Sequence, residues 1–178
     1  MLIWFQVHTL LKGLEKIANS ANIPMVIAGD LNSIPGSAPH ALIVDRYVDI
    51  SSNRLAADPL NLFSMDKAAM PSHSLNLYSV YSAAYNSKTL SVGVDQLRMQ
   101  LDDIFHEPKY TNITHDFKET LDYIYYTSPE LELTGVLDLP QLCDILDGNL
   151  SAGLPNAKCA SDHVALMAEF AFGGDRTP

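Results

Sequence analysis

Apolar and polar positions along the chain change their period several times, and each change marks a new element. Between Gln6 and Ala21 the apolar residues recur every three or four positions, with lysines and a glutamate on the other side. This spacing predicts an amphipathic helix. The next stretch, Ile23 to Ala28, is continuously apolar. A short apolar run of this kind is typical of a strand that is buried on both faces.

Turn-forming residues follow the apolar run and precede a second helix. Ser37 stands where a helix cap is expected, and Pro39 fits the first turn of a helix that starts directly after Ser37. The segment 51–74 mixes Asn, Asp, Pro, Ser and Met without a clear period, which indicates a loop. Leu77–Tyr85 and Val92–Phe105 fit either a helix or a strand, and the second is expected to be helical in part.

Strand-forming residues dominate the last third of the chain. Thr120–Thr127, Leu131–Leu139 and His163–Phe172 are rich in β-branched, aromatic and other apolar residues. A helix, a strand and a helix that are followed by several strands indicate a layered α/β or α+β domain. With 178 residues the chain fits one domain of ordinary size, or part of a larger one.

Polar side chains stand at the end of the first predicted strand. Asp30 and Asn32 follow the apolar run directly, within the stretch GDLNS. These residue types favour turns, so a plain turn is one interpretation. In the alternative, the strand presents both side chains at its carboxyl end. There a carboxylate can hold a metal ion or activate water, and an amide can donate to a phosphate oxygen.

Two further acidic positions lie near the later strands. Asp122 falls inside a strand pattern, where aspartate is uncommon. It is either an exposed residue at a strand end or a buried carboxylate that orients a histidine. Asp162 and His163 directly precede the last apolar segment. Such a pair is usually a solvated loop feature, but at the mouth of a strand Asp162 can bind a metal ion and His163 can contact a reacting group.

Composition limits the classes of function. Hydrophobic residues make up 47% of the chain and charged residues 18%, so a buried core is expected. The formal net charge of −10 gives no general attraction to nucleic acid, so a polyanionic substrate needs metal ions or a few placed Lys and Arg side chains. Two cysteines form no disulfide framework, and neither a signal sequence nor a membrane span is evident. We therefore expect an intracellular protein, cytoplasmic or nuclear, that is not secreted and contacts no membrane.

Four blocks in a fixed order carry a more specific signal. QVHTLLKGLEKIA, GDLNSIPGSAPHAL, EPKYTNITHDFKETLDYIYYT and SDHVALMAEF together resemble the endonuclease/exonuclease/phosphatase superfamily, and within it the carbon catabolite repressor 4 type of poly(A) deadenylase. The resemblance covers residues 6–172 and is weakest in 51–105, a divergent or loop-rich part. It implies a four-layer α/β/β/α sandwich, of which residues 1–178 would form a single, C-terminal partial domain.

The resemblance implies a role for each residue that matches the family pattern. Asp30 would activate or position the attacking water, and Asn32 would contact the phosphate and the metal. Asp122 would hydrogen-bond His163 and fix its orientation. His163 would bind the scissile phosphate when charged, or a metal ion when neutral. Asp162 would support the metal site, so the implied metal ligands are Asp30, Asn32, Asp162 and His163.

The implied substrate is poly(A) RNA. Phe117 occupies the position that stacks on an adenine base in this family, and Asn112 is expected to be a second substrate-binding residue. The implied reaction is Mg²⁺-dependent hydrolysis of the 3′-terminal phosphodiester, which releases AMP in the 3′→5′ direction, with two metal ions in the site. A deadenylase complex scaffold is an implied partner.

Several features depart from the family pattern. The early Asn, the metal-binding Glu and the phosphate-side His of the family's N-terminal half have no counterpart in this sequence, and none of the other glutamates is placed to replace that ligand. Leu31 stands where the family often has Phe, and Glu119 where it commonly has Gly. We therefore expect impaired activity, marginal stability, and association with another chain through an open sheet face. The alternatives are an inactive homologue that binds RNA or a partner, and a phosphatase of the same superfamily.

Overall fold

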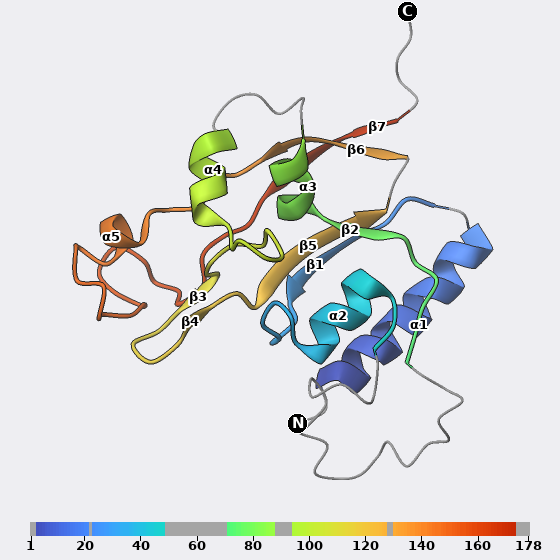
Figure 1. Cartoon of the computed structure of the whole chain (residues 1–178), viewed down its shortest axis with the longest axis horizontal. Helices are drawn as coiled ribbons and strands as arrows, with labels where there is room; N and C mark the ends of the chain where they lie inside the picture. Colours follow the sequence, from blue (N-terminus) through green and yellow to red (C-terminus); the bar gives the residue numbers. More distant parts are fainter. Residues whose placement is uncertain (1–2, 22, 49–70, 88–93, 128–129, 174–178) are drawn as a thin grey trace, which may run out of the picture.

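The structure is a computed structural model, and it describes residues 3–21, 23–48, 71–87, 94–127 and 130–173. Helices and strands pack together in it as a mixed α/β fold, which confirms the predicted class (Figure 1). Most of the loop predicted for 51–74 lies outside these residues. Among the described helices, none is both long and apolar enough to cross a membrane.

The first two helices form where the apolar spacing predicts them. α1, Ile3–Ala21, begins slightly before the predicted start and turns its apolar side inward. α2, Ala38–Asp45, has a proline in its first turn, as expected. Ser37 occupies the N-cap position, but its hydroxyl donates to the carbonyl oxygen of Ile34 (2.6 Å) and makes no bond to the helix. The predicted side-chain cap is therefore wrong, because the preceding turn takes the hydroxyl.

Three antiparallel strands form the central sheet in the order β1-β5-β2 (Figure 1). They are β1, Val26–Asp30, β5, Asp122–Thr127, and β2, Leu77–Ser79. β5 is the middle strand and contacts both others. The register places Asp30 opposite Asp122, so the two carboxylates lie side by side at one end of the β1–β5 pair.

Smaller elements surround this sheet. They are α3, Val80–Asn86; α4, Val94–Gln100; β3, Asn112–Ile113; β4, Lys118–Glu119; β6, Leu131–Val136; α5, Leu142–Ile145; and β7, Ala168–Phe172. β3 pairs with β4, and β6 pairs with β7. Within 51–105, the part expected to be divergent or loop-rich, the described residues hold β2, α3 and α4. Apolar residues such as Val80 and Leu97 anchor these elements in the core.

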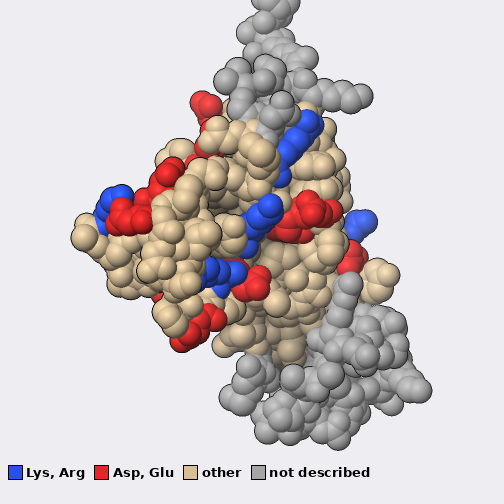
Figure 2. All heavy atoms as spheres, turned by 60° about the vertical axis from the view of Figure 1, so that its left-hand side comes forward, with Lys and Arg blue, Asp and Glu red and all other residues tan. Residues whose placement is uncertain are grey.

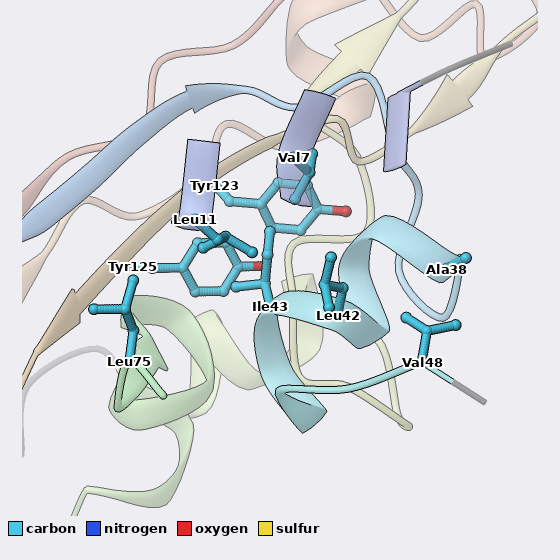
Figure 3. Close-up of a cluster of buried hydrophobic side chains, with 9 residues drawn as sticks. All are labelled: Val7, Leu11, Ala38, Leu42, Ile43, Val48, Leu75, Tyr123 and Tyr125. Carbon is cyan, nitrogen blue, oxygen red and sulfur yellow. The ribbon is translucent and has the colours of Figure 1, made fainter. Parts of the chain in front are cut away.

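The middle strand is buried on both faces. Tyr123 and Tyr125 point toward α1 and α2 and pack in one cluster with apolar side chains of those helices (Figure 3). Ile124 and Tyr126 point the other way, since side chains alternate along a strand, and they pack in a second cluster with residues of α3, β6 and β7. The tyrosines of this strand are therefore core residues, and β5 is the element that joins the two halves of the core.

β1 departs from the predicted burial. The strand extends to Asp30 instead of ending at Ala28, and Val26 is 47% exposed. β1 lies at the edge of the sheet, and α1 and α2 cover only the face that carries Ile27. The expected burial on both faces is thus wrong for β1 and describes β5 instead. Tyr78 of β2 lies on the same face as Val26 and is also 45% exposed, whereas Tyr126 between them is covered by the second cluster.

The last strand is shorter than predicted. Only Ala168–Phe172 pair with β6, whereas His163 forms an isolated bridge with Asn112 of β3. The chain between these points passes from β3 to β6, so a single straight strand over 163–172 cannot reach both partners. Apolar content alone does not reveal this change of partner.

Two neighbouring tyrosines provide a matched test of this core. The Tyr123 hydroxyl donates to the Ser33 carbonyl oxygen at 2.6 Å, whereas the buried Tyr125 hydroxyl has no partner within the described residues. Tyr123→Phe should lower the free energy of unfolding by about 1–3 kcal/mol, because a buried carbonyl loses its donor. Tyr125→Phe should leave it unchanged or raise it by up to about 1 kcal/mol, because an unsatisfied hydroxyl is removed. Urea unfolding measures both, and the opposite ranking would contradict these contacts.

Candidate active site

Two of the expected site residues, Asp30 and Asn32, contact each other in a short turn at the end of β1. The backbone N–H of Asn32 donates to Asp30 Oδ1 at 2.7 Å, and the Asn32 side-chain amide donates to Asp30 Oδ2 at 3.4 Å. Asn32 adopts φ 47°, a left-handed conformation that Asn tolerates better than most residues. Both interpretations of this stretch are therefore correct. Asp30 is the last residue of β1, and the turn after it brings the Asn32 side chain back to the Asp30 carboxylate.

A carboxylate and an imidazole face each other next to this turn. His163 Nδ1 lies 2.8 Å from Asp122 Oδ2, which is the contact that the sequence resemblance implies. A carboxylate accepts but does not donate, so Nδ1 carries the proton in this contact. Asp122 is held by the sheet, and its own N–H donates to Thr111 Oγ1 at 2.9 Å. The second ring nitrogen of His163 remains available for a substrate.

The charges around His163 favour its protonated form. The hydrogen bond to Asp122 is the largest influence and raises the pKa of His163, with the negative charges of Asp122, Asp162 and Asp30 acting in the same direction. Partial burial is the second-largest influence and acts in the opposite direction, but the pKa of His163 is still raised on balance. His163 can therefore offer a positive charge to a phosphate group over a wider pH range than an isolated histidine.

Asp162 and Asn112 form a second contact beside the pair of Asp122 and His163, which we call the dyad. The Asn112 side-chain amide donates to Asp162 Oδ2 at 3.3 Å, and the Asp162 carbonyl oxygen accepts from the N–H of Ile113 at 2.8 Å. Asn112 is buried, with 6% of its surface exposed. Its amide nitrogen thus holds Asp162 in place, and a role in binding substrate stays a prediction.

An apolar hollow of about 580 Å³ adjoins these residues. Asn32, Asn112 and Phe117 all line it, so the structure brings together three residues that the sequence places far apart. Phe117 lies at the tip of the β3–β4 hairpin and is 37% exposed. Sequence reasoning missed the apolar wall of the hollow, which comes from Ile3, Ile34, Pro39 and Leu121. Ile34, Pro39 and Leu121 stand in the family blocks, but nothing in the sequence marks Ile3.

The expected metal ligands do not gather into a complete metal site. Among the residues that the structure describes, no group of three or more His, Cys, Asp and Glu side chains is placed to hold a metal ion. Both oxygens of Asp30 accept from Asn32, and Asp162 accepts from Asn112. A site for Mg²⁺ needs several oxygen ligands around one point. The expected set of Asp30, Asn32, Asp162 and His163 is therefore only part of a metal site in the described residues.

The other glutamates occupy different environments. Hydrogen bonds from Lys12 and from Ser74 lower the pKa of Glu15 to about 2, and they tie this side chain to α1 and the segment before β2. Glu107 is buried, 2% exposed, beside His40 of α2. Glu119 is exposed on β4. None of them joins Asp30 and Asp122 in a metal-binding group within the described part of the chain.

The remaining histidines and the cysteines are accounted for by their surroundings. His40 and His73 are buried, and His106 stacks on the ring of Tyr85 with centroids 3.8 Å apart. His115 is exposed on the β3–β4 hairpin beside Asp116. The two cysteines, Cys143 and Cys159, are free thiols.

The chain is similar to proteins of one family along most of its length. The sequence model of the family described as "Endonuclease/Exonuclease/phosphatase family" matches residues 6–163. Carbon catabolite repressor protein 4 homolog 2 of Arabidopsis thaliana is 44% identical over 169 residues, which cover 94% of this chain and 27% of that protein. The CCR4-Not complex 3′-5′-exoribonuclease subunit Ccr4 of Aspergillus fumigatus is 33% identical and covers 89% of this chain and 19% of its own length. The chain thus spans about a quarter or less of these relatives.

The fold also matches a solved structure. A crystal structure of ANGEL2, a 2′,3′-cyclic phosphatase, in complex with adenosine-2′,3′-vanadate superimposes with a TM-score of 0.62 and 24% identity. The match covers 93% of this chain and 50% of that chain. At this identity the match concerns the fold alone. Together with the sequence matches it confirms the family resemblance and the fold class that the four sequence blocks predict.

The dyad makes a prediction for the titration of His163. Asp122→Asn removes the negative charge and leaves only a neutral amide oxygen as acceptor for the His163 N–H, so the pKa of His163 should fall toward its ordinary value. NMR titration of the ring in metal-free buffer measures the change. Asp116→Asn, which removes an exposed carboxylate from the β3–β4 hairpin, is the matched control and should leave the titration of His163 unchanged.

The same dyad predicts how stability depends on pH. Because the pKa of His163 is raised by folding, its contact with Asp122 stabilises fully below the unfolded value, about 6.5, and the effect is lost as pH rises through the folded value. The difference in unfolding free energy between the parent and Asp122→Asn should therefore shrink as pH rises above about 6.5 and through the raised pKa of His163. A constant difference over this range would count against the dyad.

Proposed function

The chain belongs to the endonuclease/exonuclease/phosphatase family, whose sequence model matches residues 6–163, and we propose that its site hydrolyses phosphodiester bonds in poly(A) RNA. The proposed activity is that of a poly(A) deadenylase, a 3′→5′ exoribonuclease that shortens mRNA poly(A) tails and releases AMP. One observation carries the proposal. The Asp30–Asn32 turn and the Asp122–His163 dyad converge at one end of the β1–β5 pair, beside the hollow that Phe117 lines.

The proposed chemistry assigns one task to each group. His163 binds a non-bridging oxygen of the scissile phosphate as a cation, and Asp122 holds its ring in place. Asp30 positions the water whose oxygen forms the new bond to phosphorus, and it accepts a proton from that water. The 3′ oxygen of the preceding nucleotide is the leaving group. Asn32 donates from its amide to a phosphate oxygen, so that the turn at the end of β1 serves both the nucleophile and the phosphate.

The hollow next to these groups suits an unpaired base. Its wall is mostly apolar, and Phe117 presents an aromatic ring at its rim. Stacking on an aromatic ring binds any base face and requires no base-edge hydrogen bond. We propose that the terminal adenine stacks on Phe117 and that Asn112 supports it, while the phosphate lies toward His163.

We propose that the activity requires Mg²⁺, with Asp30, Asn32 and Asp162 among the ligands. His163 joins them only when its ring is neutral, in place of its contact with the phosphate. The bound ion would neutralise phosphate charge and lower the pKa of water. At least one further acidic ligand must come from outside the described residues, because those residues hold no group of three or more ligating side chains. We therefore expect the 178-residue chain to cleave slowly when it is tested alone.

The surface supports local rather than general binding of RNA. The formal net charge is −10, and Figure 2 shows acidic side chains interspersed with Lys and Arg on the face that it displays. Non-specific affinity for a polyanion is therefore weak. In the proposal, stacking on Phe117 and the charge of His163 supply the attraction at the site itself.

Partner proteins are a further part of the proposal. The fungal relative is by name a subunit of the CCR4-Not complex, and we propose that this chain associates with a deadenylase complex. Val26 and Tyr78, which are about half exposed on the two strands that flank β5, form the surface proposed for contact with another polypeptide. An apolar fluorescent dye should bind the parent more strongly than Val26→Lys. Equal binding by both proteins would remove the support for this surface.

Hydrolysis of RNA tests the proposed function. The purified chain is incubated with 5′-labelled oligo(A) with and without Mg²⁺, beside Asp30→Ala and the control Asp138→Asn, which changes an exposed carboxylate outside the site. We expect slow, metal-dependent loss of single nucleotides from the 3′ end. Asp30→Ala should abolish it, and Asp138→Asn should cleave at the parental rate.

Each contrary outcome has a distinct meaning. Cleavage that Asp30→Ala does not affect would point to a contaminating nuclease and contradict the assigned site. Binding of oligo(A) without any cleavage by the folded chain would favour an inactive homologue. A 2′,3′-cyclic nucleotide, included as a second substrate, separates the phosphatase alternative, which predicts hydrolysis of that compound in preference to oligo(A).

A further inference from the structure

The segment from Gly153 to Val164 runs along one edge of β3. The N–H of Leu154 donates to the Ile113 carbonyl oxygen at 2.7 Å, and the N–H of Ile113 donates to the Asp162 carbonyl oxygen at 2.8 Å. On its other edge β3 pairs with β4. The hairpin that carries Phe117 is therefore fixed by the segment that also carries Asp162 and His163.

Gly153 is the point of closest approach between this segment and the hairpin. A Cβ atom built on Gly153 would lie 2.8 Å from Thr114 Cα, and it would meet the carbonyl carbon of Thr114 and the nitrogen of His115 at even shorter range. All three are backbone atoms, which cannot rotate out of the way as the end of a side chain can. Space, and not an unusual backbone conformation, therefore requires glycine at this position.

Hydrogen bonds couple the position of Thr114 to that of Phe117. The N–H of Thr114 donates to the Phe117 carbonyl oxygen at 2.7 Å, and the N–H of Phe117 donates to Thr114 Oγ1 at 3.1 Å. Lys118 Nζ donates to the Thr114 carbonyl oxygen at 2.9 Å and closes the same turn. A displacement of Thr114 must therefore move the aromatic ring that lines the hollow.

The buried neighbours make this arrangement rigid. Leu154 is 5% exposed and packs with Ile113 and Leu146 in a cluster of its own. The segment thus cannot retreat from the hairpin without opening that cluster. If a side chain is added at Gly153, the exposed hairpin is the part that moves.

We propose that Gly153 is a positioning residue that sets the distance between the base-stacking ring of Phe117 and the phosphate-binding His163. The segment 153–164 acts as a spacer: its first residue contacts the hairpin turn, and its later residues carry Asp162 and His163. The role in substrate binding rests on the proposed function, whereas the positioning of the hairpin does not.

The test of positioning uses Gly153→Ala and two measurements. Hydrogen exchange at the Leu154 amide reports whether the segment still pairs with β3, and we expect exchange about tenfold faster in the variant. Amides of the β1–β5 pair should exchange as in the parent, which shows that the fold is intact. Gly13→Ala is the matched control, because a Cβ there meets no atom within 4 Å. Unchanged exchange at Leu154 in Gly153→Ala would overturn the proposal.

A double-mutant cycle tests the route through Phe117. Binding of short oligo(A) is measured in metal-free buffer, where Phe117→Ala should weaken it about tenfold through lost stacking. Gly153→Ala should weaken binding by a similar factor, and the double variant should bind no more weakly than Phe117→Ala alone. Multiplied losses in the double variant would show that Gly153 acts elsewhere and would overturn the proposal.

Two further outcomes are informative. Thr114→Val removes the hydroxyl that accepts from the Phe117 N–H and donates to the Phe117 carbonyl oxygen. It should show the same non-additivity with Phe117→Ala, and it tests the same route if Gly153→Ala fails to fold. If the parent chain binds no oligo(A) while Gly153→Ala still accelerates exchange at Leu154, the proposed function fails and the positioning of the hairpin by Gly153 stands.

Discussion

The pairing of β1 with β5 is the constraint on which the site depends. Its antiparallel register sets Asp30 opposite Asp122, so two carboxylates that are distant in the sequence become neighbours at one end of the sheet. Two like charges in this position repel each other unless a positive group shares them. His163 supplies that charge through its contact with Asp122, and the same contact raises its pKa. A shift of the register by one residue would turn one of the carboxylates to the other face, and the two carboxylates would no longer be neighbours.

The register is secure because β5 is anchored in two cores at once. Tyr123 and Tyr125 pack under α1 and α2 (Figure 3). Ile124 and Tyr126 pack against α3, β6 and β7. Slippage of β5 would expose both sets of side chains together. β1 lacks this anchoring because it lies at the sheet edge, with Val26 half exposed. The site is thus built on one rigid strand and one strand whose outer edge and one face are open.

The sequence predicts those parts that depend on local pattern. The period of the apolar residues locates α1, the β-branched and aromatic run locates β5, and the four family blocks identify Asp30, Asn32, Asp122 and His163 as a group. The relative placement of elements that are distant in the chain is harder to predict from the sequence. The edge position of β1 follows from the order of strands, which no single stretch encodes. The isolated bridge of His163 with Asn112 divides a segment whose apolar content resembles one continuous strand.

Nucleotide binding at the described site tests the central claim most directly. In an NMR titration of the labelled chain with AMP, the account predicts shifts for Asn32, Phe117 and His163. Asn32 and Phe117 line the hollow, and His163 is proposed to bind the phosphate. Resonances of α3 and β6, which face the opposite core, should stay in place. Shifts confined to another surface, or none at a concentration that saturates an RNA-binding control protein, would contradict the claim that these residues form a single nucleotide site.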